Sequence, residues 1–396
     1  MRSTLLFAAL ALALGTAEAA ETQRYVVLTP EATIGHLHAT VDGDTVSVDY
    51  DVKDNGRGPT MKETLRLSEA GLPVEWSISG ATTFGSKVDE RFAVADGKAT
   101  WKDAVGTGEA ANATGALYIG QSGTPWALGV YARALMADVD GRIATLPGGE
   151  LRLEKGDMLE VGTGPAKQTV QRVTLSGLDL DPTHLLVEAD GDLFAVLATR
   201  GLLIREGYEA DAERLRQLTV ELGEQRFIAM QAEVAHRYEH PVRIRNVRVF
   251  DPKTGTRSAP VSVVVYRDRI SGIQPLDATG TGPEVIVEGE GGTLVPGLYE
   301  MHGHIGQNRT VLNLAAGITS VRDMGNDNDV LDRLIESIES GKLAGPRITR
   351  AGFIEGRSPF NSNNGYLVSS QAQALEAVRW YAARGFPQIK LYNSMN

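Results

Sequence analysis

Hydrophobic and polar residues alternate with a period of two through much of the first half of the chain. The alternation is clearest over residues 45–52, where every second residue is apolar. Successive side chains of a strand point to opposite faces, so this pattern predicts strands with one buried face. The pair Asp96-Gly97 between two such runs is typical of a hairpin turn. We therefore predict a β-rich, antiparallel N-terminal domain over residues 21–205, with a short helix near residues 126–136.

The pattern becomes helical after about residue 206. Apolar residues recur every three to four positions over residues 210–236, which predicts a long helix, and Pro241 cannot continue it. We assign residues 206–240 to this connecting helix. Its expected apolar positions are Leu215, Leu218, Leu222, Phe227, Ile228 and Met230. Residues 241–295 then carry short apolar runs separated by tight turns, which indicates short strands.

Strands and helices alternate after Pro296, as a parallel α/β fold requires. We expect a first strand that ends at His304, followed by strands at residues 318–323, 346–353 and 388–392. Apolar stripes and end signals place helices between the later strands, with Gly341 ending one, a Ser370/Gln373 capping box starting the next and Gly385 ending it. A complete (β/α)8 barrel needs about 250 residues and this segment has about 100, which corresponds to roughly its first half.

The first of these strands ends in His302-Gly303-His304 after a Pro-Gly turn. Residues two apart on a strand point the same way, so both imidazoles can reach one metal ion. Imidazole suits zinc and similar divalent ions, and the carboxyl end of a barrel strand is where such folds place their active sites. This run is the strongest candidate for chemistry in the chain.

Two other histidine pairs are weaker candidates. His36 and His38 also form a His-x-His on a predicted strand, but without the Pro-Gly entry or the following strand–helix units. His236 and His240 fall where we expect the long helix to end, and a histidine there meets the helix dipole favourably. We expect neither pair to bind a metal.

The sequence resembles the amidohydrolase superfamily in the run V-P-G-L-Y-E-M-H-G-H and in the upstream segments VRIRNVRVFDPKTG and RDRISGI. Its members are metal-dependent hydrolases built on a (β/α)8 barrel. These segments are most similar to the imidazolonepropionase-like and Xaa-Pro dipeptidase-like branch. The family usually has an aspartate before the His-x-His, whereas the nearby acid here is Glu300. The resemblance begins near His240. It implies a multidomain chain in which residues 241–295 form a small β-sandwich and residues 296–396 the first half of a TIM-type barrel.

The resemblance also implies a site. His302, His304 and Lys390, at the end of the fourth strand, would hold a divalent metal, expected to be zinc, as one or two ions. In many family members the lysine is carboxylated and bridges two metals; in others it is unmodified. Arg322 and Asp323 are expected to orient neighbours through hydrogen bonds. Two further candidates, Tyr392 and Asn393, are expected above strand four, in contact with substrate.

Other family ligands are expected from later strands: two histidines from strands five and six, and the general-base aspartate from strand eight. In this numbering they would lie beyond Asn396. We therefore expect residues 1–396 to be the N-terminal portion of a larger enzyme, binding metal weakly and hydrolysing nothing alone.

The first twenty residues predict a secretory signal peptide. Arg2 precedes an apolar run over residues 5–14, and Ala17-Glu18-Ala19 is a small-x-small cleavage site. The chain has no cysteine, hence neither disulfides nor a lipid-modified cysteine anchor. Its net charge of −11 argues against nucleic acid and anionic membrane as partners. A periplasmic or extracellular location follows, while the oligomeric state stays open.

Two functions remain in view. The first is an exported metal-dependent amidohydrolase that uses metal-activated water to hydrolyse a C–N bond in an amide, a cyclic amide or a dipeptide. The alternative is a non-catalytic periplasmic protein whose β-rich domain binds a ligand or partner and whose half-barrel is degenerate. Continuation of the reading frame with two histidines and an aspartate at barrel-like spacing would favour the enzyme.

Overall fold

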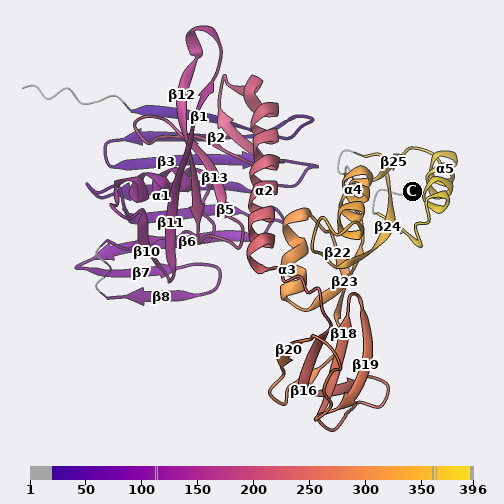
Figure 1. Cartoon of the computed structure of the whole chain (residues 1–396). Coiled ribbons are helices and arrows are strands. Elements are labelled where there is room, and N and C mark those ends of the chain that lie inside the picture. The colour runs from indigo at the N-terminus through magenta and orange to yellow at the C-terminus, as the bar shows by residue number, and fades with distance from the viewer. Residues whose placement is uncertain (1–19, 112, 114, 359–360, 363, 393–396) are drawn as a thin grey trace, which may run out of the picture. The chain divides into compact units, whose positions relative to one another are not determined.

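The computed structural model describes residues 20–392 except 112, 114, 359–360 and 363, so nearly all of the predicted signal peptide lies outside the described residues. The chain forms two compact units, Met1–Glu221 and Leu222–Asn396, and we describe each by itself (Figure 1). None of the helices in the described part is long and apolar enough to cross a membrane.

The first unit contains one fifteen-stranded sheet with the order β8-β7-β6-β5-β4-β3-β2-β1-β15-β14-β13-β12-β11-β10-β9. Neighbouring strands are antiparallel, except that β9 and β10 are parallel. Two meanders meet where β1 pairs with β15, so the first and last strands of the unit lie side by side. The strands are β1 (Glu21–Leu28), β2 (Thr33–Asp42), β3 (Thr45–Val52), β4 (Thr60–Leu67), β5 (Pro73–Ala81), β6 (Lys87–Ala95), β7 (Lys98–Lys102), β8 (Thr107–Ala110), β9 (Leu117–Tyr118), β10 (Arg142–Leu146), β11 (Glu150–Val161), β12 (Gln168–Ser176), β13 (Thr183–Val187), β14 (Leu193–Val196) and β15 (Leu202–Arg205).

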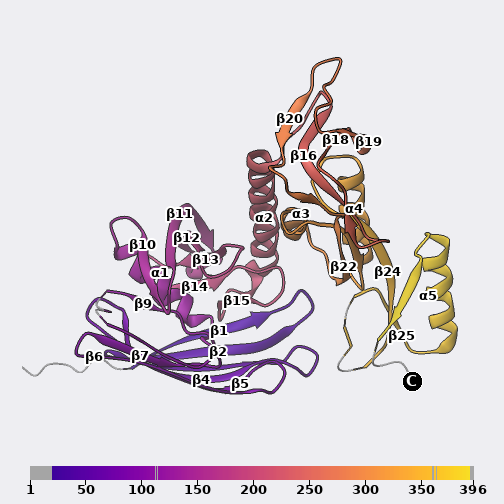
Figure 2. The same cartoon turned by 90° about the horizontal axis from the view of Figure 1, so that it is seen from below.

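Helix α1 (Trp126–Ala137) packs against the inner face of this curved sheet. Figure 2 shows it between strands β1–β8 and β10–β13. The helix is apolar on nearly all sides, which is the pattern of a buried helix. A Cβ on Gly129 would lie 2.9 Å from the Cβ of Leu193, so the helix packs against β14 at a distance only glycine allows. The predicted hairpin is present, with positive φ at both Asp96 and Gly97.

Helix α2 (Ala212–Val234) spans the boundary between the two units. The expected end at Pro241 is wrong, because the helix stops at Val234 and the following segment is irregular. His236 and His240 lie in that segment, past the last helical residue. The expected apolar stripe is also only partly buried: Phe227 is 1% exposed, whereas Ile228 is 60% exposed. Consecutive helical residues point about 100° apart, so one packing face cannot bury both.

The second unit begins with a six-stranded sheet around β16 (Val242–Asp251). We expected a small β-sandwich over residues 241–295, but the described strands form this one sheet. The physical reason is that β16 is long enough to pair antiparallel with two strands and parallel with two others, with a register shift between Ile244 and Val247. The other strands are β17 (Thr256–Arg257), β18 (Val261–Tyr266), β19 (Arg269–Pro275), β20 (Val285–Glu288) and β21 (Thr293–Leu294).

A parallel α/β segment follows. Strand β22 (Leu298–Gly303) pairs with β23 (Ile318–Asp323), β23 pairs with β24 (Arg347–Gly356), and β24 pairs with β26 (Gln388–Leu391). All pairings are parallel and follow chain order, as in the first half of a (β/α)8 barrel. A short strand that the sequence did not predict, β25 (Tyr366–Val368), also pairs with the end of β24.

Three helices accompany these strands: α3 (Thr310–Ala315), α4 (Asn328–Glu339) and α5 (Gln371–Ala383). The Asp327 side chain caps α4 by accepting hydrogen bonds from two backbone N–H groups, and the Ser370 side chain caps α5 by accepting one, from the N–H of Gln373. Positive φ angles at Gly341 and Gly385 accompany the helix ends, as predicted. The apolar core beneath the segment includes Phe227 of α2, Val321 of β23, and Leu331 and Leu334 of α4.

Candidate metal centre

His302 and Lys390 meet at the carboxyl ends of β22 and β26. The Lys390 Nζ lies 3.1 Å from the His302 Nε2, although 88 residues separate them. Lys390 stands beside Phe353 in the register of β26 and β24, and β24 and β23 connect it to β22. The order of the parallel strands therefore brings the predicted lysine to the first of the two predicted histidines.

His304 is oriented by a backbone carbonyl. Its Nδ1 lies 2.6 Å from the oxygen of Gly325, in the turn after β23. Since a carbonyl only accepts, Nδ1 carries a proton in this contact, and in the neutral ring the lone pair is then on Nε2. This is the tautomer that metal-binding histidines adopt when the other ring nitrogen is hydrogen-bonded. The two histidine rings are 5.6 Å apart, centre to centre.

Asp323 and Arg322 contact the backbone around the histidines. Asp323 is fully buried at the end of β23, and its carboxylate accepts hydrogen bonds from the backbone N–H groups of Ile305 and Gly325. The Arg322 Nε donates to the Met301 carbonyl at 2.6 Å. Both side chains thus hold the end of the first barrel strand to the second.

Tyr392 lies against the lysine. The Lys390 Nζ is 5.3 Å from the centre of its ring, and the ring packs at 5.4 Å on that of Phe353. A cation facing an aromatic ring at this distance is attracted to it. Asn393, the other candidate above strand four, lies outside the described residues.

Sequence reasoning assigned no role to three residues that shape this site. Glu300, which stands near the position of the family's usual aspartate, accepts a hydrogen bond from the His302 backbone N–H at 2.7 Å. Gly325 supplies the carbonyl that orients His304, and Asn326 bridges Asp323 and the Ile305 carbonyl. The glycine after a strand-ending Arg-Asp pair was the available signal, but only the fold shows which side chain its carbonyl faces.

The donors present fit a divalent metal in their chemistry. Two imidazoles and one amine are nitrogen ligands of the kind zinc accepts, and catalytic zinc sites use three protein ligands plus water. In the part of the chain that the structure describes, no three His, Cys, Asp or Glu side chains are grouped closely enough to hold a metal. Among these residues Lys390 would be the third donor, and it could ligate only as the neutral amine or as its carbamate.

The histidine pair on β2 has a different environment. The rings of His36 and His38 contact each other at 4.6 Å, and the His36 Nε2 lies 3.5 Å from Asp49 on β3. Burial lowers the pKa of His38, and the neighbouring His36 acts in the same direction. The expectation that this pair binds no metal stays a prediction.

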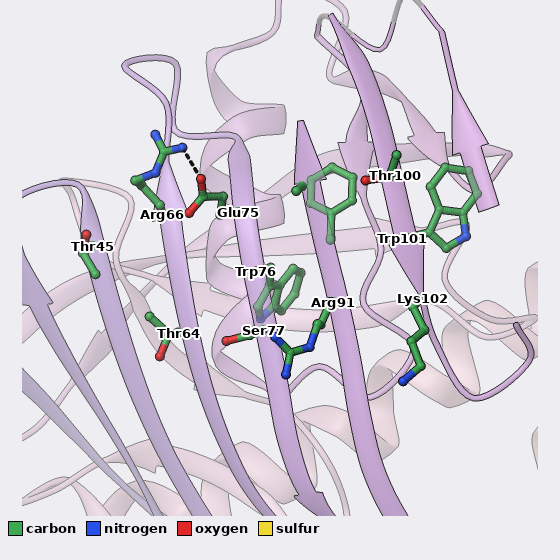
Figure 3. A pocket seen from close by; sticks show the side chains of 12 residues that line it. Thr45, Thr64, Arg66, Glu75, Trp76, Ser77, Arg91, Thr100, Trp101 and Lys102 are labelled. Carbon is green, nitrogen blue, oxygen red and sulfur yellow. Dashed lines mark hydrogen bonds and ion pairs between the residues drawn. The ribbon is translucent and has the colours of Figure 1, made fainter. Parts of the chain in front are cut away.

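The first unit also carries a surface depression of about 530 Å³ over strands β3 to β7 (Figure 3). Its charged side chains are paired. Arg66 donates to Glu75 at 2.8 Å, and both Arg91 and Lys102 contact Asp89. These pairs satisfy the charges locally, so the depression by itself indicates no particular ligand.

Comparisons with known proteins give partial similarities. Neither a family model nor a curated protein matches the chain. Among solved structures, a putative prolidase from Bifidobacterium longum is 22% identical, over 40% of this chain and 42% of that one, with a TM-score of 0.35. A Xaa-Pro dipeptidase with methionine bound in its active site is 26% identical, over 38% and 46%, with a TM-score of 0.34. Bottromycin amidohydrolase is 19% identical, over 43% and 37%, with a TM-score of 0.34.

The chain spans less than half the length of each of these proteins. At such TM-scores the similarity assigns neither an activity nor a substrate. The proposal below therefore rests on the residues and contacts of this chain.

Proposed function

We propose that this chain carries the strand-one and strand-four side of a metal-dependent amidohydrolase site. The reaction would be hydrolysis of a C–N bond in an amide, a cyclic amide or a dipeptide. The observation that supports it most is the 3.1 Å approach of the Lys390 Nζ to the His302 Nε2, beside a His304 whose Nδ1 donates to the Gly325 carbonyl. These donors come from the strand ends where a barrel of this kind places its site.

Each residue has a distinct task in this proposal. A bound divalent ion, zinc by its donor set, would activate water and polarise the substrate carbonyl. His302 and His304 would hold the ion through Nε2, and Lys390 would contribute either its neutral amine or its carbamate. The Tyr392 ring packs on the buried ring of Phe353 and lies beside the lysine, where it suits the apolar part of a small substrate.

We further propose that the protein is exported and that residues 1–396 alone are inactive. The signal-like segment at residues 1–20 supports export to the periplasm or the extracellular space. The donors identified are two imidazoles and one amine, so we propose that residues 1–396 alone bind zinc weakly and hydrolyse no amide. An amide or dipeptide substrate is a small-molecule partner, and the negative net charge supports neither nucleic acid nor an anionic membrane as a partner.

The test combines zinc binding with hydrolysis. Equilibrium dialysis of the exported chain should show zinc binding that is lost in His302→Ala and retained in the matched double variant His36→Ala/His38→Ala. Hydrolysis of a dipeptide and amide panel should be sought in this chain and in the longest product of the same reading frame, where chelation should abolish it. Zinc binding unchanged in both His302→Ala and His304→Ala, or hydrolysis that persists with chelator, would sink the proposal.

A further inference from the structure

The Asp323 carboxylate binds the backbone on both sides of the contact that orients His304. One oxygen, Oδ2, accepts from the N–H of Ile305 at 2.8 Å, and Ile305 directly follows the histidine. The other, Oδ1, accepts from the N–H of Gly325 at 3.0 Å, and the carbonyl of that glycine accepts from the histidine ring. One buried carboxyl group thus ties the residue after the histidine to the glycine whose carbonyl accepts the histidine's hydrogen bond.

Asn326 completes this arrangement. Its Nδ2 donates to the Ile305 carbonyl at 2.8 Å and to the Asp323 Oδ2 at 3.1 Å. Both backbone polar groups of Ile305 are therefore bound by side chains, one from the end of β23 and one from the turn after it. Ile305 itself is 4% exposed, so these hydrogen bonds are shielded from water, where loss of a partner is costly.

Gly325 is restricted as well. Its φ of +144° is one that residues with a side chain rarely adopt, and a Cβ there would lie 2.6 Å from the Phe353 ring. Only glycine therefore fits at this position, where its N–H is held by the Asp323 carboxylate. His302 is held differently, through Glu300 at its backbone N–H and Lys390 at its ring.

We infer that Asp323 is a positioning residue for His304: with Asn326 and Gly325 it sets the tautomer and direction of this imidazole before any metal binds. A carboxylate suits this role because both oxygens accept and three N–H donors converge on it. An asparagine of the same shape must turn its amide toward at least one of those donors. The part of this inference that concerns metal affinity rests on the proposed function, whereas the tautomer does not.

The decisive measurement is the ¹⁵N spectrum of the histidine side chains in the metal-free protein. The chain has seven histidines, and His304→Ala identifies the signals of His304. We expect a protonated Nδ1 and an unprotonated Nε2 in the wild type, and a mixture of tautomers in Asp323→Asn. The zinc dissociation constant should rise about tenfold to a hundredfold in Asp323→Asn, as for loss of other partners behind a metal ligand.

The matched control is Asp327→Asn. Asp327 lies four residues further on and caps α4, and an asparagine oxygen can accept the same backbone hydrogen bonds, so the substitution should change thermal stability little and leave the His304 tautomer unchanged. If Asp323→Asn does not fold, Asn326→Ala replaces it, because it removes one donor to Asp323 and the hydrogen bond to Ile305. The same tautomer mixture is expected there.

The outcomes separate the two proposals. A folded Asp323→Asn, or Asn326→Ala in its place, with the wild-type tautomer overturns the positioning role. A changed tautomer in a protein whose wild type binds no zinc supports the positioning role and removes the proposed metal function. A changed tautomer together with weakened zinc binding supports both.

Discussion

The Glu63 carboxylate of β4 accepts a hydrogen bond from the backbone N–H of Thr124, just before helix α1, at 2.5 Å. Glu63 is 3% exposed, and its other oxygen has no hydrogen-bond partner among the described residues. On β6, Glu90 accepts hydrogen bonds from the Tyr118 hydroxyl and from the N–H groups of Gln121 and Ser122. Two buried acids on the inner face of the sheet therefore hold the start of the helix that fills it.

This arrangement predicts a pH dependence of stability. Burial raises the pKa of Glu63 to about 7, and the charge of Glu90 acts in the same direction. Because the folded state keeps the proton to higher pH than the unfolded chain, the free energy of unfolding should fall as pH rises from about 4.5 to 7, and level off above. The difference is at most roughly 3 kcal/mol.

Glu63→Gln tests this dependence, because its amide mimics the protonated acid. Urea unfolding between pH 5 and 8 should show a smaller fall in stability for Glu63→Gln than for the wild type. The control is Glu75→Gln, an exposed carboxylate on β5 whose pKa the Arg66 hydrogen bond lowers. That group is ionised in both states over this range, so its replacement should leave the slope unchanged. Equal slopes in Glu63→Gln and the wild type would contradict the prediction.

Phe227 and Ile228 provide a matched pair on helix α2. Phe227 packs into the core beneath the parallel strands, whereas Ile228 is largely exposed. Phe227→Ala should therefore cost about 3–5 kcal/mol of stability, and Ile228→Ala should stay within about 0.5 kcal/mol of wild type. Thermal and denaturant unfolding of the two variants would measure this. Similar losses in both would mean that the helix packs through a different face.

Gly129 and Gly223 are both helical glycines, but only Gly129 is closely packed against another element. An alanine Cβ at Gly129 would meet Leu193, whereas nothing lies within 4 Å of the Cβ position of Gly223 in α2. Gly129→Ala should destabilise the first unit by about 1–3 kcal/mol through overpacking against the Leu193 Cβ. Gly223→Ala should stabilise its helix by about 0.5–1 kcal/mol. Stabilisation by both substitutions would rule out the close contact with β14.

Much of the secondary structure could be predicted from the sequence because it depends on neighbours along the chain. The alternation over residues 45–52 matches β3, and the apolar run near Trp126 matches α1. In the second unit, β23 has its predicted bounds and Ser370 caps α5. The end of α2 was mispredicted because the helix stops before Pro241, at residues with no strong stop signal.

The sequence by itself determined the periodicity of the elements and the His302-Gly303-His304 spacing, since both are properties of a few consecutive residues. Only the tertiary structure decided that β1 lies beside β15, that Lys390 approaches His302, and that the Gly325 carbonyl orients His304. Such contacts join residues far apart in the chain. They depend on the order and register of strands, which follow from how the whole core is buried rather than from any local pattern.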